Sequence, residues 1–238
     1  MERQEKLGWI VNIIFAILIL VADICFIVID CSPYITKTIA SILFVLCGAY
    51  NLFYCLYVLK IRKNLSFMWL MFLGLVLAML GDILLIDYFV VGAILFGTGH
   101  VFFFLSFCMI SGFSIRDLII GAIIFVLAFL LIEFYSNFDF GGMKILVIVY
   151  ALIISLMLGK ALSNMFCKNN LLIYSVILLG AGLFFISDLM LMFYLFAGRA
   201  VVFDIICLAT YYPAEFILAL SIYLVSNKLM STSSNFRK

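Results

Sequence analysis

Long runs of apolar residues, separated by short polar stretches, fill the chain from one end to the other. A helix needs about 20 apolar residues to cross the hydrocarbon core of a bilayer. We therefore expect an all-α bundle of eight transmembrane helices that forms a single domain over residues 1–226, with a polar cytoplasmic tail at 227–238. The expected spans are about 8–29, 34–59, 66–87, 89–112, 117–136, 142–163, 170–195 and 201–226.

The composition supports this class and excludes an ordinary soluble domain. Hydrophobic residues make up 68% and charged residues 11% of the 238 positions, whereas globular proteins average roughly 45–50% apolar and about 25% charged. The net charge of only +2 gives no sign of a nucleic-acid partner. The cysteines lack metal-binding spacing and His100 is the only histidine, so we expect neither a metal ion nor another cofactor.

The basic residues predict an orientation through the positive-inside rule. If the N-terminus is cytoplasmic, eleven of the 14 basic residues lie inside, so we expect both termini in the cytoplasm. The composition favours a bacterial cytoplasmic membrane over the endoplasmic reticulum. The expected inside residues are Arg3, Lys6, Lys60, Arg62, Lys63, Arg116, Lys160, Lys168, Lys228, Arg237 and Lys238, and the outside residues are Lys37, Lys144 and Arg199.

Two aspartates lie inside apolar runs in similar settings. Asp82 follows Gly74 by eight residues, and Asp188 follows Gly180 by the same interval. A charged residue near the bilayer centre costs about 2.5–3.5 kcal/mol on insertion scales. The two could simply brace the bundle as ion pairs, but a buried ion pair rarely stabilises more than a hydrophobic replacement. Since two carboxyl groups that share a site tend to divide into one acid and one base, we interpret them as candidate catalytic residues.

Other polar groups are expected at a similar depth in the membrane. The lysine that opens the second span could reach Asp82 or a phosphate, and the lone histidine needs polar partners in its apolar helix. Pro213 is expected to kink the eighth span beside further polar residues. The candidate substrate-binding residues are Lys37, His100, Tyr211, Tyr212 and Glu215. Asp23 and Glu133 also lie within spans, and we assign them no role beyond that of polar partners.

The spacing of charged residues suggests an internal repeat. Lys37 precedes Asp82 by 45 residues, and Lys144 precedes Asp188 by 44. Two parallel four-helix repeats, related by an axis along the membrane normal, would place two aspartates and two lysines in pseudo-symmetric positions. Lys144, at the start of its span, could instead extend toward the outer head groups.

Taken together, these motifs resemble the YhhN family of eight-span membrane proteins, which includes the lysoplasmalogenases. The resemblance rests on Lys37, Gly81-Asp82, His100, Ser187-Asp188 and the group Tyr211, Tyr212 and Glu215. The chain departs from the family pattern at Thr38, where proline is usual, and at Glu215, where glutamine is usual. The added acid could change the proton balance or the preferred head group.

The resemblance implies a membrane lipid hydrolase that cleaves the vinyl-ether bond of lysoplasmalogen-type lysophospholipids, giving a fatty aldehyde and a glycerophospho-base. This reaction requires an acid, a base and negative charge near a cationic intermediate, which a carboxyl pair can supply. Two alternatives stay open. In a proton-coupled transporter of small solutes, paired carboxylates would carry protons, and a non-catalytic protein would only bind lipid. The oligomeric state is left open.

Overall fold

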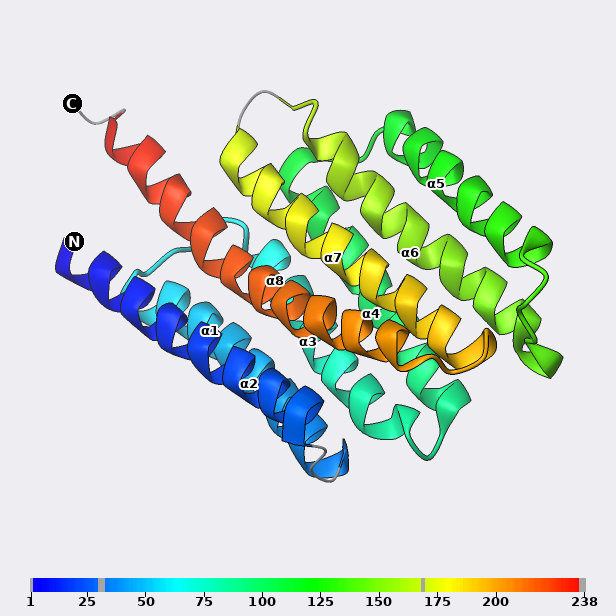
Figure 1. The fold of residues 1–238 in the computed structure, drawn as a ribbon. Coiled ribbons are helices and arrows are strands. Elements are labelled where there is room, and N and C mark those ends of the chain that lie inside the picture. The colour runs from blue at the N-terminus through cyan, green and yellow to red at the C-terminus, as the bar shows by residue number, and fades with distance from the viewer. Residues whose placement is uncertain (1, 30–32, 168–169, 236–238) are drawn as a thin grey trace.

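The computed structural model describes residues 2–29, 33–167 and 170–235 (Figure 1). In these ranges it contains eight helices long and apolar enough to cross a membrane, and no strands, which confirms the predicted fold class. The helices are α1 (Glu2–Ile29), α2 (Pro33–Phe53), α3 (Leu65–Leu85), α4 (Phe89–Ser111), α5 (Ile115–Phe134), α6 (Lys144–Asn164), α7 (Leu171–Phe196) and α8 (Val201–Asn235). A π-helical turn, Tyr54–Val58, follows α2, and a 3₁₀ turn, Gly141–Met143, precedes α6.

Local sequence signals set the ends of several helices. Pro33 begins α2, at a position where the missing N–H of proline costs nothing. Ser114 and Asp117 form a capping box that begins α5, and Gly112, with a φ of 74°, ends α4. The last helix continues through Pro213 to Asn235, so residues 227–235 of the expected polar tail are helical. Lys168, Arg237 and Lys238 from the predicted inside set lie outside the described residues.

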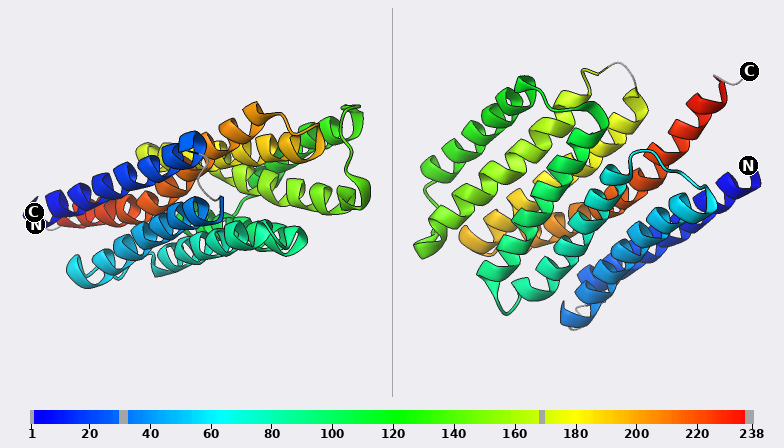
Figure 2. Two further views of the ribbon diagram at one scale, coloured as in Figure 1. Left: turned by 60° about the horizontal axis from the view of Figure 1, so that its bottom comes forward. Right: turned by 180° about the vertical axis from the view of Figure 1, so that it is seen from behind.

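The helices form two layers. The left view of Figure 2 shows α2, α3 and α4 in one layer and α1, α7 and α8 in the other. Contacts join the layers, because α8 packs on α2 and α3 as well as on its neighbours α1 and α7, and α4 packs on α6. Asp82 therefore comes from one layer, on α3, and Asp188 from the opposite layer, on α7.

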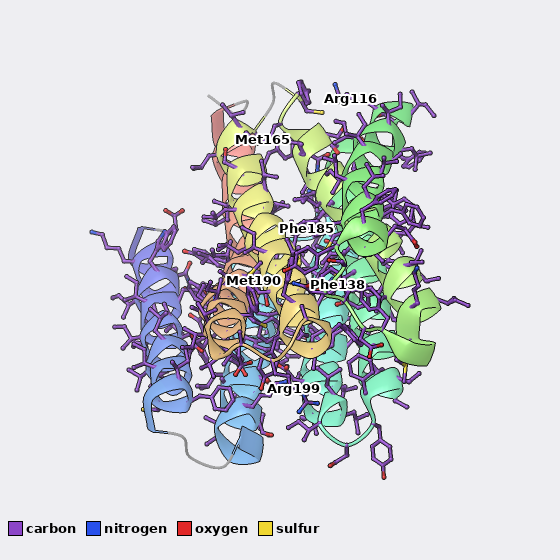
Figure 3. The ribbon with its side chains drawn as sticks, turned by 45° about the vertical axis from the view of Figure 1, so that its right-hand side comes forward. Arg116, Phe138, Met165, Phe185, Met190 and Arg199 are labelled. Atoms are coloured by element: carbon purple, nitrogen blue, oxygen red, sulfur yellow. The ribbon has the colours of Figure 1, made fainter. Side chains whose placement is uncertain are left out.

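The two ends of the bundle can be told apart by their loops. Both termini lie at one end (Figure 1), as an even number of spans requires. Arg116 and Met165 lie at that same end, and Arg199 lies at the opposite end (Figure 3). We call these the terminal end and the Arg199 end. This separation of Arg116 from Arg199 agrees with the charge-based topology, and which end faces the cytoplasm stays a prediction.

Candidate functional site

The first polar cluster surrounds Asp82. Lys37 Nζ lies 3.1 Å from Asp82 Oδ1, and the Ser41 hydroxyl donates a hydrogen bond to Asp82 Oδ2 at 2.7 Å. Lys37 and Ser41 are one helical turn apart on α2, so both groups face the same side of that helix. The Asp82 side chain is only 3% exposed. The contact between Lys37 and Asp82, one of two that the sequence left open, is therefore present.

The second cluster surrounds Asp188 and draws on three helices. The Tyr150 hydroxyl, from α6, donates to Asp188 Oδ2 at 2.6 Å. His100 Nε2, from α4, lies 3.1 Å from the same oxygen and 2.8 Å from the tyrosine hydroxyl. Both partners hold Oδ2, so these contacts leave Asp188 Oδ1 available to a ligand. The sequence predicted that His100 needs polar partners, but it did not single out Tyr150, one of 12 tyrosines.

Helix α8 contributes three candidate residues around these two clusters. The Tyr212 hydroxyl donates to the Lys37 carbonyl oxygen at 3.4 Å, and the Tyr211 ring packs edge-on against Phe96 and Phe184. Glu215 is fully buried, and its carboxylate oxygens have no hydrogen-bond partner among the described residues. It interacts electrostatically with both Asp82 and Asp188, so the Glu215 carboxyl group lies within reach of both clusters.

A polar cavity joins the two aspartates. It is a partly open space of about 470 Å³ near the Arg199 end, where α2 and α8 begin and α3 and α7 end. Its ionisable lining side chains come from both layers. The polar lining residues are Lys37, Asp82, Ser187, Asp188, Asp204, Cys207 and Tyr211. Asp82 and Asp188 thus face the same space, although each has its own hydrogen-bond partners.

An apolar cavity of about 760 Å³ adjoins the polar one. It lies mainly between α4, α5, α6 and α7, and Tyr150 and Asp188 are the polar side chains in its lining. The two cavities share four residues, namely Leu85, Phe96, Asp188 and Leu191. Asp188 therefore stands on the boundary between a charged cavity and a hydrocarbon-like one.

Two sequence-based expectations need correction or refinement. Lys144 does not mirror Lys37, because its ammonium group forms an ion pair with Glu133 at 2.8 Å instead of reaching Asp188. The expected second lysine at the aspartate site is therefore wrong, since only Lys37 contacts one of the two aspartates. His100 is fully buried and lines neither cavity, so it contacts the Asp188 carboxylate without facing the cavity space. Asp204, which the sequence did not single out, lines the polar cavity.

Asp23 of α1 is buried, and its Oδ1 atom has no hydrogen-bond partner among the described residues. The same part of the chain contains no group of three or more histidine, cysteine, aspartate or glutamate side chains that could hold a metal ion. The polar groups that line the two cavities are carboxyl, ammonium, phenol, thiol and hydroxyl groups.

The family model described as the YhhN family matches residues 32–222. This range begins just before α2, ends within α8, and contains both candidate catalytic residues and all five candidate substrate-binding residues. No curated protein and no solved structure matches the chain.

Proposed function

The chain belongs to the YhhN family, and on this basis we propose that it is an integral membrane hydrolase of lysoplasmalogen-type lysophospholipids. The observation that supports this proposal most directly is the position of Asp188, at the boundary between the polar and the apolar cavity. The vinyl-ether bond of the substrate lies at a comparable boundary, since it joins the polar glycerophosphate part to the apolar hydrocarbon chain.

The two cavities suit the two parts of such a lipid. The hydrocarbon chain binds in the apolar cavity, where each methylene group removed from water contributes about 0.8 kcal/mol. The glycerophosphate part binds in the polar cavity, and its phosphate pairs with Lys37. Binding in this orientation brings the vinyl ether to Asp188 Oδ1, because Tyr150 and His100 hold the other oxygen.

The reaction begins when Asp188 donates a proton to the β-carbon of the vinyl ether, which leaves an oxocarbenium ion. The nearby carboxylates stabilise this cation. Asp82, paired with the Lys37 ammonium group at 3.1 Å, accepts a proton from water while the water oxygen bonds to the cationic carbon.

The resulting hemiacetal then collapses. Its hydroxyl proton returns to Asp188 as the carbonyl forms, and the bond to the glycerol oxygen breaks. That oxygen takes the proton held by Asp82. One water molecule is consumed, one aldehyde and one glycerophospho-base are released, and both aspartates regain their starting protonation states.

The proposal is tested by measuring aldehyde release from a lysoplasmalogen by the purified protein reconstituted in lipid. We expect turnover by the native protein and none by Asp82→Asn or Asp188→Asn. Asp87→Asn is the matched control, because Asp87 is an exposed aspartate just beyond the end of α3, and it should keep native turnover.

Three outcomes would contradict the proposal. Native turnover by Asp82→Asn or by Asp188→Asn would contradict the assignment of these residues as acid and base. Lysolipid binding without any turnover would favour the non-catalytic alternative. Proton-coupled solute uptake by proteoliposomes, without lipid cleavage, would favour the transporter.

A further inference from the structure

The polar cavity carries one more charged group than the proposed reaction uses. Asp204 lies in the first turn of α8 and lines the cavity together with Lys37, Asp82 and Asp188. The described residues offer its carboxylate no hydrogen bond or ion pair. Its strongest charged neighbour is Lys37, with which it interacts electrostatically, although Lys37 makes its close contact with Asp82.

The positive and negative charges of the side chains that line this cavity do not balance. Lys37 is the one basic side chain in its lining, and it faces two carboxylates, Asp82 and Asp204, even when Asp188 holds the proton that the proposed reaction needs. Lys37 is the natural partner of a lipid phosphate, since an ammonium group binds phosphate as a point charge. A purely anionic head group would bring its negative charge close to Asp204 as well, whereas a head group that also carries a cation would give that carboxylate a partner.

We propose that Asp204 binds the ammonium group of a zwitterionic head group while Lys37 binds the phosphate of the same lipid. This inference rests on the proposed function and assigns recognition of the head-group amine of its substrate to Asp204. In such a head group a two-carbon bridge separates the phosphate from the amine. The lysine and the aspartate present opposite charges to these two groups from the starts of α2 and α8.

A simpler role for Asp204 is to stabilise the N-terminus of α8, where an acidic residue interacts favourably with the helix dipole. That role predicts a change in stability, or an equal change for every substrate. It predicts no change in the preference between head groups, so a measurement of head-group preference separates the two roles.

The test compares two vinyl-ether lysolipids that differ only in the head group, one with phosphoethanolamine and one with phosphoglycerol. We expect Asp204→Asn to lower kcat/KM for the ethanolamine lipid about tenfold, the size of effect that loss of a charge-assisted hydrogen bond gives. The value for the glycerol lipid should stay unchanged. Asp204→Glu should restore part of the preference, and Asp87→Asn should keep all of it.

A binding measurement keeps this inference separate from the proposed reaction. Alkyl-ether lysophosphatidylethanolamine and lysophosphatidylglycerol lack the vinyl ether, so their binding can be followed by thermal shift without any turnover. If the native protein cleaves neither vinyl-ether lipid, the proposed function fails, and a native preference for binding the ethanolamine lipid that Asp204→Asn removes would still support the role of Asp204. The inference would be overturned if Asp204→Asn weakened the binding of both lipids by the same factor. It would also be overturned if the variant kept the native preference for the ethanolamine lipid.

Discussion

The ion pair between Asp117 and Lys160 gives a prediction that does not depend on the function. Lys160 Nζ lies 2.8 Å from Asp117 Oδ2, and the two side chains are 2% and 1% exposed. The same ammonium group also donates to the Gly112 carbonyl oxygen at the end of α4. Lys160→Met keeps an unbranched side chain but leaves the Asp117 carboxylate buried without its counter-ion. We expect this to lower the free energy of unfolding by about 3–5 kcal/mol.

The protein contains a matched control for this experiment. Lys144 and Glu133 also lie 2.8 Å apart, but their side chains are 45% and 29% exposed. Because solvent screens an exposed pair and can replace a lost partner, Lys144→Met should cost no more than about 1 kcal/mol. The two substitutions are chemically identical and the two contact distances are equal. The difference between them therefore reports the burial of the Lys160 pair together with the hydrogen bond from Lys160 to the Gly112 carbonyl oxygen.

The assay is unfolding of the purified protein from mixed micelles with increasing sodium dodecyl sulfate, followed by circular dichroism. The free energy of unfolding is compared between the native protein, the Lys160 variant and the Lys144 variant. A Lys160 variant no less stable than the Lys144 variant would refute the reasoning. It would mean that Asp117 is neutralised or solvated without its lysine at no appreciable cost.

Two further predictions concern the site and the helix packing. Tyr150→Phe removes the hydroxyl that donates to Asp188 Oδ2 at 2.6 Å but keeps the ring in the apolar cavity, so kcat for aldehyde release should fall roughly 10–100-fold with little change in KM; an unchanged kcat would contradict this. Gly159→Ala would place a Cβ atom 2.5 Å from the backbone of Gly121 and should lower the free energy of unfolding by about 1–3 kcal/mol. Gly182→Ala, which meets no atom within 4 Å, is the control and should leave that free energy unchanged or raise it by up to about 1 kcal/mol.

Some of the site could be anticipated from residues that are conspicuous in an apolar sequence. Asp82 and Asp188 stand out because a charge in a membrane helix is costly, and His100 stands out because it is the only histidine. The contact of Lys37 with Asp82 was one of the possibilities that the sequence left open, and it is present in the structure. Each of these inferences used the cost of a polar group within a single helix, which can be estimated without knowing its neighbours.

Other members of the site carry no such signal. Tyr150 is one tyrosine among many, and its contact with Asp188 depends on how α6 is rotated against α7. Lys144 has nearly the sequence spacing of Lys37, yet it pairs with Glu133 across the α5–α6 connection. Asp204 is near a helix end, where an acid is unremarkable, and only the fold brings it into the cavity that contains Lys37 and both candidate catalytic residues.

The sequence by itself determined the number and approximate extent of the helices, because the bilayer requires each span to be apolar and to satisfy its own backbone hydrogen bonds. These are local requirements, and they can be read along the chain. Only the tertiary structure decided which side chains meet, that Asp82 and Asp188 face one cavity from opposite layers, and that Asp188 also borders an apolar cavity. Those features depend on the rotation and close packing of helices that are far apart in the sequence, and apolar spans of similar composition leave that packing undetermined.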